Sequence, residues 1–561
     1  MAKITFMPDN ITVEAAAGTS LLAAARMAGL ALESPCDGIG TCGKCKARVT
    51  AGRETLTLTD DRHKLSAAEA ADGFVLACQA AAGGDVTVET VSGTERNKTL
   101  KILSEGRSFS YDIVNYITKT FAGGRTTVLA GGAPIGAEDG DTAAFNYGLA
   151  VDIGTTTLVC ALIDALTGEE LATVSALNPQ SLRAQDVLTR IKFASTPAGL
   201  QEMHSSISRQ FRDMVSELCG KTGVERRFIY EAVYSGNTTM ITLAAGVDPA
   251  SLGKYPYTPR LRGGNHISAP EHGLDISPFG LIYLPPVVSA YVGPDITSGI
   301  LAVRLHEKKG TTLFIDIGTN GEMAIAKSGS LSATSTAAGP AFEGMNITHG
   351  MRADAGAIEY FAVREDGETE LRTIGGVKPV GICGSGLFDI VGELARVGVI
   401  GASGRFAPPR PGSGPDGLPA ALAGRVTVRE GKPAFLVADG VYLTQSDVRQ
   451  VQLAKGAVRA GVEALLRSEN VGYADVTAVQ IAGSFGYHLQ AKSLVNLALL
   501  PPEFADRIEF VGNTSKSGAR AFLLNVPCRG EMEALVQNIT CLELADQEGF
   551  DRLFVKSMSF T

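Results

Sequence analysis

Tryptophan is absent from the 561-residue chain, and aromatic residues make up only 6% of it, whereas glycine is abundant with 65 residues. This composition is typical of a turn-rich α/β protein in which small side chains pack closely. Positive charge is not in excess either, because 50 Lys and Arg stand against 59 Asp and Glu. A nucleic-acid-binding protein needs a basic face, so we expect no nucleic-acid partner.

The sequence also lacks a long hydrophobic run and a leader-like start. Its longest apolar stretch, residues 280–292, is interrupted by Pro285 and Pro286, so we expect no membrane-spanning helix. Residues 1–10 lack the charged start and the apolar core of a secretory signal. We therefore expect a cytoplasmic protein with no membrane partner, long enough for roughly three or four domains.

The nine cysteines fall into two classes. Four lie within residues 36–78, and in a long chain of this kind such a cluster indicates a metal site. The others are scattered, which is typical of buried thiols. They are Cys160, Cys219, Cys383, Cys528 and Cys541.

The clustered cysteines have the order of an iron–sulfur ligand set. Five residues separate Cys36 from Cys42, two separate Cys42 from Cys45, and Cys78 follows 33 positions after Cys45. Glycines between them let the loop turn sharply and keep side chains away from the sulfides, and loop amides can hydrogen-bond the sulfurs. A zinc site or plain buried cysteines are the alternatives. The order and the glycines favour a 2Fe–2S cluster, with the spacing of adrenodoxin-like ferredoxins.

The residues around the cysteines support a small separate domain. Short strands are predicted at 3–6, 11–14 and 47–50, and Thr19 or Ser20 can cap a helix that runs to Met27. We predict a β-grasp ferredoxin-type domain over residues 1–95. Residues 96–147 show no clear period and are interpreted as a linker with a small middle module.

An internal repeat follows. An apolar strand ends in Asp152, and a similar strand ends 164 positions later in Asp316. Each is followed by a Gly–Thr turn and a second strand. A glycine at such a bend presents backbone N–H groups and hydroxyls to a phosphate, and the Asp can hold a hydrated Mg²⁺. Two facing turns would hold a nucleotide between two lobes.

The expected site residues follow from these turns. Asp152 and Asp316 are the predicted catalytic carboxylates. Glu322 could orient the attacking water, although an exposed Glu at the end of a strand is the equal alternative. The predicted nucleotide-binding residues are Gly154, Thr155, Thr156 and Thr157 in the first turn, Gly318, Thr319, Asn320 and Gly321 in the second, and Gly483, Ser484, Phe485 and Gly486 in a late glycine-rich turn.

This arrangement resembles the actin-like (ASKHA) ATPase superfamily over about residues 148–561. The resemblance implies that the three turns are its phosphate-1, phosphate-2 and adenosine motifs, that ATP and Mg²⁺ bind there, and that residues 512–519 line the adenosine side. The expected fold class is therefore α/β and multi-domain. It combines a β-grasp 2Fe–2S ferredoxin domain with a two-lobed actin-like ATPase domain made of two related halves.

The fusion of these two parts resembles the reductive activators of corrinoid proteins, the RACo-type activases. Similar segments include residues 235–240, 291–295, 338–344, 381–386 and 446–449. The resemblance implies an ATP-hydrolysing activase that passes one electron from the cluster to inactive Co(II), giving the Co(I) corrinoid used for methyl transfer. It implies a corrinoid protein of a methyltransferase system and a low-potential electron donor as partners, and a homodimer.

Several alternatives remain open at this point. Asp295 and Glu343 could contact the nucleotide, Mg²⁺ or a partner, or could simply fix loops, and Cys383 is interpreted as a small buried residue. The chain could instead activate another low-potential enzyme, although such activators usually bridge a 4Fe–4S cluster across a dimer. It could also be a redox sensor that binds nucleotide without turnover. A sugar or acyl kinase would not need the fused ferredoxin.

Overall fold

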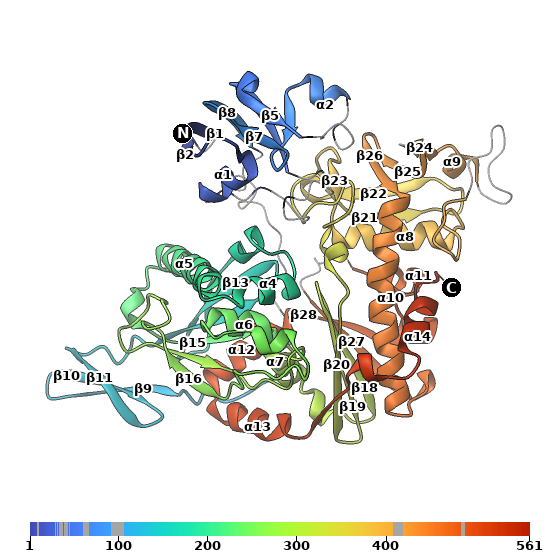
Figure 1. Cartoon of the computed structure of the whole chain (residues 1–561). Helices are drawn as coiled ribbons and strands as arrows, with labels where there is room; N and C mark the ends of the chain where they lie inside the picture. The colour runs from blue at the N-terminus through green and yellow to red at the C-terminus, as the bar shows by residue number, and fades with distance from the viewer. Residues whose placement is uncertain are drawn as a thin grey trace. The chain divides into compact units, whose positions relative to one another are not determined.

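The structure is a computed structural model that describes residues 1–7, 10–28, 30, 32, 38, 43, 45–59, 65, 67–90, 106–407, 419–429, 431–483 and 489–560. The chain divides into two compact units, residues 1–100 with 179–185 and residues 101–178 with 186–561 (Figure 1). In the part of the chain that is described, no helix has both the length and the apolar character needed to cross a bilayer.

The N-terminal unit is built on a five-stranded sheet of order β2-β1-β8-β4-β6, beside a small sheet of order β3-β7-β5. Its elements are β1 (Ala2–Met7), β2 (Ile11–Ala15), β3 (Thr19–Ser20), α1 (Leu21–Met27), β4 (Lys46–Ala51), β5 (Leu56–Leu58), α2 (Ala67–Ala71), β6 (Phe74–Leu76), β7 (Ala80–Ala82) and β8 (Val86–Thr90). The Ser20 hydroxyl accepts a hydrogen bond from the Ala23 amide and caps α1, as predicted. Ile4, Phe6 and Leu21 lie in its buried core.

Residues 117–139 form an ordered three-stranded antiparallel sheet where the sequence indicated only a small middle module. Its strands are β9 (Ile117–Ala122), β10 (Arg125–Ala130) and β11 (Ala133–Asp139). Both connections are two-residue Gly-Gly hairpins, at 123–124 and at 131–132, and all four glycines have positive φ. Two-residue hairpins need such backbone conformations, which glycine adopts without strain. The alternation of apolar and polar residues extends over only a few positions in each strand. The Gly-Gly turns were therefore the stronger sequence signal for this sheet.

The first lobe is built on a six-stranded sheet of order β14-β13-β12-β15-β17-β16. These strands are β12 (Tyr147–Ile153), β13 (Thr157–Asp164), β14 (Glu170–Leu177), β15 (Ile229–Gly236), β16 (Asn265–Ser268) and β17 (Leu281–Leu284). β12 pairs antiparallel with β13 and parallel with β15. Asp152 therefore lies opposite Ser235 near the end of both strands.

The second lobe repeats this arrangement in a sheet of order β28-β27-β18-β19-β20-β29. Its strands are β18 (Thr311–Ile317), β19 (Gly321–Lys327), β20 (Ser330–Thr336), β27 (Val476–Ala482), β28 (Ile508–Gly512) and β29 (Ile539–Cys541). β18 pairs antiparallel with β19 and parallel with β27, so it has the position that β12 has in the first lobe. Five strands thus follow the same order in both lobes, and the sequence repeat marks their central strands.

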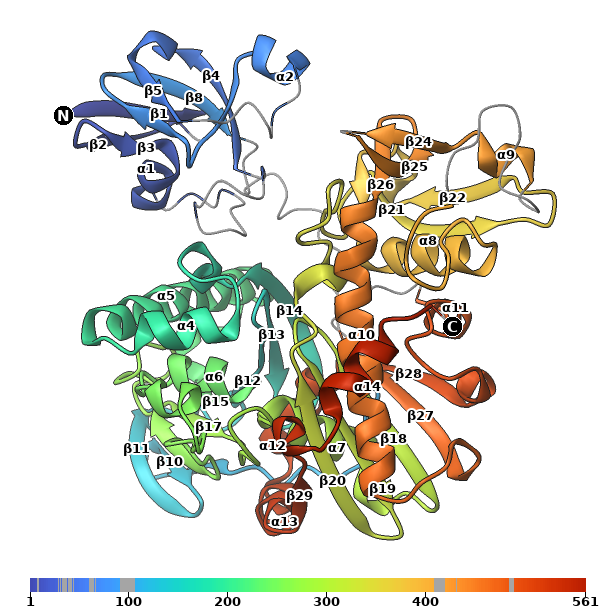
Figure 2. The same ribbon diagram turned by 45° about the vertical axis from the view of Figure 1, so that its right-hand side comes forward.

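The helices of the second unit are α4 (Val187–Ala194), α5 (Pro197–Thr222), α6 (Thr238–Ala244), α7 (Pro294–Val303), α8 (Gly384–Arg396), α9 (Ala420–Ala423), α10 (Gln445–Ser468), α11 (Ala491–Asn496), α12 (Thr514–Leu524), α13 (Val526–Val536) and α14 (Phe550–Ser557). They cover both sheets, except α8 and α9, which lie with the smaller sheets described below (Figure 2). α12 and α13 come from the end of the chain but lie with the first lobe. Leu523 packs against Gly148, where an added Cβ would come within 2.6 Å of the leucine side chain.

The second lobe carries an additional part beyond its main sheet. It contains the sheets β22-β21-β23 and β24-β25-β26 together with α8 (Figure 1). The strands are β21 (Ala357–Val363), β22 (Thr369–Thr373), β23 (Gly381–Ile382), β24 (Val426–Arg429), β25 (Lys432–Ala438) and β26 (Val441–Thr444). Its side chains share one buried core with α10 and β27, which joins this part to the lobe.

Candidate functional site

Two of the four predicted cluster cysteines lie within the described residues, and they come together. Lys46 pairs with Leu76 in the antiparallel ladder of β4 and β6, so the residues just outside this pair lie at one end of the ladder. The Ala77 amide donates to the Cys45 carbonyl at 2.7 Å. The Sγ atoms of Cys45 and Cys78 are 3.3 Å apart. Cys36 and Cys42 lie outside the described residues.

The geometry around these thiols fits a metal–sulfur centre. A sulfur separation of 3.3 Å is much longer than a disulfide bond of about 2.05 Å, so the two thiols converge without being joined. Gly38 has φ +84°, and a Cβ there would lie 3.4 Å from Leu22 Cδ2 and 3.8 Å from Cys78 Cβ. A side chain at this position would therefore be strained and would crowd the cysteine.

The predicted phosphate-1 turn connects β12 and β13, and other side chains hold its carbonyl groups. Asn178 Nδ2 donates to the Gly154 carbonyl at 2.9 Å, and Arg190 donates to the Thr155 carbonyl at 2.6 Å. Asn237, the N-cap of α6, donates to Thr155 Oγ1 at 3.1 Å. A Cβ on Gly154 would lie 2.5 Å from the Thr157 carbonyl oxygen, so only glycine fits there.

The predicted phosphate-2 turn connects β18 and β19 in the same way. Gly318 N donates to the Asn320 carbonyl at 2.9 Å and closes the turn. Thr319 Oγ1 donates to Glu343, the last residue of the short helix η6 (Pro340–Glu343). The same Thr319 oxygen lies 3.5 Å from Thr156 Oγ1 of the first turn. The two predicted turns therefore meet across the lobes, although 163 positions separate the two threonines.

Four carboxylates lie in mutual electrostatic contact beside these turns, and we call them the carboxylate cluster. They are Asp152 at the end of β12, Asp295 in the first turn of α7, Asp316 at the end of β18 and Glu322 on β19. Glu322 is only 5% exposed, so the alternative of an exposed strand-end Glu is wrong. Its Oε1 atom has no hydrogen-bond partner within the described residues.

The proximity of these acids shifts their protonation. Burial, followed by the negative charges of Asp295 and Asp152, raises the pKa of Asp316 to about 8. Burial and the charge of Asp152 raise the pKa of Asp295 to about 7, against a hydrogen bond from the Ile296 amide that lowers it. Burial, followed by the charges of Asp295 and Asp316, raises the pKa of Glu322 well above its ordinary range. A cation would relieve this repulsion.

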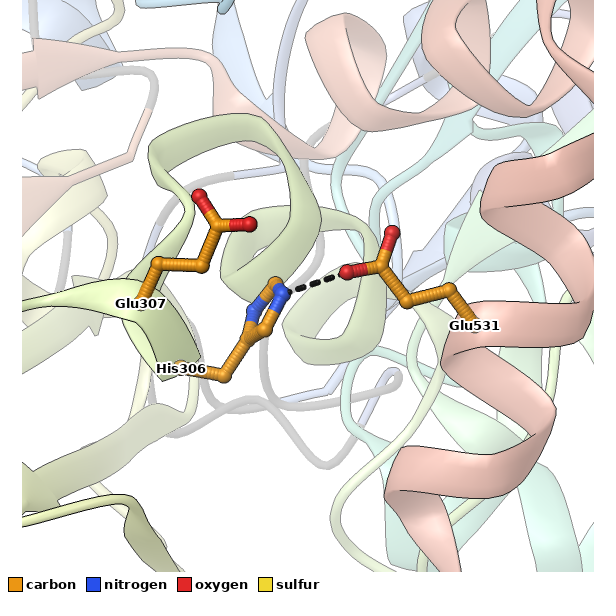
Figure 3. A group of neighbouring side chains, drawn as sticks. All are labelled: His306, Glu307 and Glu531. Atoms are coloured by element: carbon orange, nitrogen blue, oxygen red, sulfur yellow. Dashed lines mark hydrogen bonds and ion pairs between the residues drawn. The ribbon is translucent and has the colours of Figure 1, made fainter.

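A tighter group of possible metal ligands lies elsewhere, at His306, Glu307 and Glu531. It is the only such group of three within 4.8 Å among the described residues. Figure 3 shows His306 hydrogen-bonded to Glu531, and the nitrogen–oxygen distance is 2.7 Å. Arg304 donates to both Glu531 oxygens at 2.8 and 2.7 Å and also pairs with Glu307. Because the Arg304 guanidinium already pairs with Glu307 and Glu531, we interpret this group as an ion-pair cluster.

The late glycine-rich turn begins at Gly483, directly after β27, while Ser484, Phe485 and Gly486 lie outside the described residues. The Gly483 amide donates to the Gly512 carbonyl at 3.3 Å. The segment 512–519 therefore starts beside the predicted adenosine motif, as the resemblance implies. It then continues as α12, whose first residues bind Asp152 on the phosphate side. Cys383 is buried at the start of α8, as interpreted from the sequence.

Sequence reasoning did not identify the residues that hold the turns. Asn178 and Arg190 contact the turn after Asp152 from positions without a glycine-rich pattern. Asn513 and Ser515, in the segment expected to line the adenosine side, contact Asp152 itself. The available signal was their polarity in otherwise apolar surroundings. Arg190 is fully buried, yet its sequence context on α4 resembles that of any amphipathic helix.

Three family profiles match the chain. The profile of the 2Fe-2S iron-sulfur cluster binding domain matches residues 4–83, and that of the RACo middle region matches residues 147–308. The profile of the C-terminal domain of RACo, the ASKHA domain, matches residues 310–561. These matches identify the ferredoxin-type and ASKHA parts independently of the motif reasoning.

Relatives of named function match most of the chain. The corrinoid activation enzyme RamQ of Eubacterium limosum is 33% identical over 426 residues, covering 74% of this chain and 70% of that protein. The Co(II) methylated amine-specific corrinoid protein reductase of Methanosarcina barkeri is 26% identical over 448 residues, covering 74% and 77%. A solved structure of a reductive activator for corrinoid, iron-sulfur protein superposes with a TM-score of 0.72 at 30% identity, covering all of this chain and 98% of that chain. The chain therefore belongs to the RACo family of reductive activators of corrinoid proteins, with a 2Fe–2S ferredoxin-type domain fused to an ASKHA domain.

Proposed function

We propose that the protein uses ATP to drive the one-electron reduction of an inactive Co(II) corrinoid to Co(I) in a corrinoid protein of a methyltransferase system. The observation that carries the proposal is the meeting of the two turns, with Thr156 Oγ1 and Thr319 Oγ1 3.5 Å apart beside the carboxylate cluster. The names of the relatives supply the acceptor, and the cysteine-bearing domain supplies the electron path.

ATP is proposed to bind between the two lobes, with its phosphates on the two turns. In a trans peptide the C=O and the following N–H point in opposite directions. Because Asn178 and Arg190 hold the carbonyls of Gly154 and Thr155 from one side, the amides of Thr155 and Thr156 face the other side. Fixed amides and hydroxyls of this kind bind phosphate oxygens. Thr157, Gly318, Asn320 and Gly321 complete the two proposed turns.

Mg²⁺ is proposed to bind at the carboxylate cluster, held by Asp152 and Asp316. Magnesium usually keeps several waters and takes only one or two carboxylates. The cluster fits this preference, because no three of its ligand atoms lie within 4.8 Å of one another, whereas those of the His306 group do. Glu322 is proposed to accept a hydrogen bond from the attacking water, and its buried, unpartnered Oε1 supports this role. Asp295 is the fourth carboxylate of the cluster.

A 2Fe–2S cluster held by Cys36, Cys42, Cys45 and Cys78 would supply a one-electron carrier. In this proposal Cys45 and Cys78 present converging thiols, and Gly38 leaves the space beside Cys78 free of a side chain. A low-potential donor is proposed to supply each electron, and the protein is proposed to act as a homodimer.

ATP is needed because the reduction is unfavourable on its own. A ligand can drive such a step only if it binds two conformations of the protein differently. Two lobes that meet through the facing turns offer such an element, since a nucleotide on both turns would fix their separation. Hydrolysis to ADP and phosphate would release that constraint and reset the protein.

The test follows the cobalt absorbance of a purified corrinoid protein in its Co(II) state, with a reductant, this protein and Mg-ATP. We expect Co(I) to accumulate only when ATP is present. The Asp316→Ala variant should lower ATP turnover by about 10²-fold or more, because metal positioning dominates phosphoryl transfer. Equal reduction without ATP would contradict the proposal. If electrons passed only to another low-potential enzyme, that enzyme would be the acceptor instead of the corrinoid protein.

A further inference from the structure

Asp152 is bound by residues from the far end of the chain. At the start of α12, Asn513 Nδ2 donates to Asp152 Oδ2 at 2.8 Å and Ser515 Oγ donates to Asp152 Oδ1 at 2.7 Å. Both donors are buried. More than 360 positions separate them from Asp152, and no sequence motif predicted these contacts.

The direction of these hydrogen bonds is fixed by chemistry. An ionised carboxylate can only accept, so the single hydroxyl hydrogen of Ser515 goes to Asp152. Ser235 Oγ lies 2.8 Å from Ser515 Oγ. The Ser235 hydroxyl is also within donating distance of Ser298 Oγ at 2.9 Å and of the Pro294 carbonyl oxygen at 3.0 Å. The three hydroxyls therefore form one connected chain that reaches Asp152 through Ser515.

This hydroxyl chain joins four elements that surround the carboxylate cluster. Ser298 lies on α7, Ser235 on β15, Ser515 on α12 and Asp152 on β12. Ser235 and Ser298 are both 0% exposed, so water does not compete for these hydrogen bonds. α7 also carries Asp295 in its first turn, one helical turn before Ser298. The chain therefore connects one acid of the cluster to the helix that carries another.

We propose that Ser515 and Asn513 are positioning residues for Asp152, and that Ser235 and Ser298 support them. Each oxygen of Asp152 accepts one hydrogen bond from α12, and an ionised carboxylate has about four acceptor sites. The orientation of the carboxylate is thereby fixed, and the remaining sites stay available to the metal and its water. The proposal rests on the Mg-nucleotide site proposed above, and it assigns Asn513 and Ser515 a role that the resemblance did not imply for residues 512–519.

Asn513 also has a second task, which decides how the proposal is tested. Its Oδ1 accepts from the Lys516 amide at 2.9 Å and caps α12, so a change there would disturb the helix itself. Ser515 is the cleaner probe. Ser493 on α11 is a matched control, because its buried hydroxyl donates to the buried carboxylate of Asp389 at 2.5 Å, outside the proposed nucleotide site.

The experiment measures ADP binding by calorimetry, with Mg²⁺ and with EDTA, on the full chain. In the Ser515→Ala variant we expect the affinity gained from Mg²⁺ to fall by about 10- to 100-fold, the usual loss when a group that orients a metal ligand is removed. Binding in EDTA should stay at the wild-type value. Ser515→Cys, with a weak S–H donor, should lie between the two. Ser493→Ala should match the wild type.

The outcomes separate this inference from the function on which it rests. If the unmodified protein binds no ADP, the nucleotide site and this inference both fail. If it binds ADP but Ser515→Ala keeps the full Mg²⁺ effect, or loses affinity equally in EDTA, only the positioning role is contradicted. Should Ser515→Ala fail to fold, Ser235→Ala removes the hydroxyl that lies 2.8 Å behind Ser515. It must then weaken the Mg²⁺ effect while sparing binding in EDTA, or the proposal is wrong.

Discussion

At the scale of single residues, the acids of the carboxylate cluster repel one another, and a bound cation would reduce this repulsion. The pKa of Asp316 is raised to about 8 and that of Asp295 to about 7, in both cases by burial and by neighbouring acids. Without a cation, these two carboxyl groups therefore hold more protons in the folded protein than in the unfolded chain between about pH 4 and pH 8. Stability from this source falls as the pH rises through that window.

We predict that Mg²⁺ with ADP stabilises the protein more at pH 8 than at pH 6. The carboxylates must lose their protons to bind a metal, and at pH 6 more of them remain protonated. The measurement is the difference in unfolding temperature with and without Mg²⁺, at constant ADP, across pH 6 to 9. Asp316→Asn removes one titrating group and should flatten the profile. A difference independent of pH in the unmodified protein would contradict the assigned metal site.

The sequence identified the acids of this cluster as candidate site residues, but it did not identify the residues that hydrogen-bond to them. Asp152 and Asp316 could be predicted because each ends an apolar strand before a Gly–Thr turn, a local pattern that occurs twice. Ser515 could not, because its partner lies 363 positions away and a serine at the start of a helix normally reads as part of a cap. Glu322 was ambiguous because burial at a strand end depends on the opposite lobe.

At the scale of elements, the phosphate-1 turn is held by side chains from three neighbouring elements. Arg190 on α4 donates to the Thr155 carbonyl and also to Met240 Sδ of α6, at 3.0 Å. Burial lowers the pKa of Arg190 to about 9, although the charges of Asp186 and Glu343 raise it, so the guanidinium remains charged at neutral pH. The turn is thus positioned by helices rather than by its own sequence.

We predict that Arg190→Met weakens ADP binding by roughly 5- to 100-fold. The substitution leaves the Thr155 carbonyl without its donor, and an unsatisfied buried group costs about 1–3 kcal/mol. Arg190→Lys should restore little, because a single ammonium cannot reproduce the guanidinium fork that reaches both Thr155 and Met240. Arg209→Met, at an exposed position of α5, is the control. Wild-type affinity in Arg190→Met would show that the turn does not depend on this contact.

Element prediction from sequence was most reliable where two independent signals agreed. The strand–turn–strand units and the helix capped by Ser20 were predicted because apolar pattern and turn chemistry coincided. The β9–β11 sheet was not, because its strands are short and partly polar, and the Gly-Gly hairpins alone were not taken as evidence of a sheet. Its strands gain order from tertiary contacts, such as the hydrogen bond from Lys119 to Tyr230 at 2.6 Å.

At the scale of the whole molecule, two chemistries are joined in one chain but rest on separate groups of residues. Cys45 and Cys78 belong to the N-terminal unit, whereas Asp152 and Asp316 belong to the second unit. Each unit has its own buried core, so a substitution at one site should not unfold the other. Because a substitution can remove the cluster or the ATPase activity and leave the other in place, this division makes the proposed coupling testable.

We predict that Cys45→Ser and Asp316→Ala fail in opposite ways. Cys45→Ser should lose iron, sulfide and the reduced EPR signal of a 2Fe–2S centre, because a serine hydroxyl is a poor substitute for a thiolate ligand. It should still bind and hydrolyse Mg-ATP at the wild-type rate. Asp316→Ala should keep full iron and sulfide content while ATP turnover falls by about 10²-fold. Neither variant should sustain Co(I) formation, because one lacks the electron carrier and the other lacks the driving reaction. If Asp316→Ala still reduced the corrinoid at the wild-type rate, electron transfer would not depend on ATP, and the fusion of the two units would need another explanation.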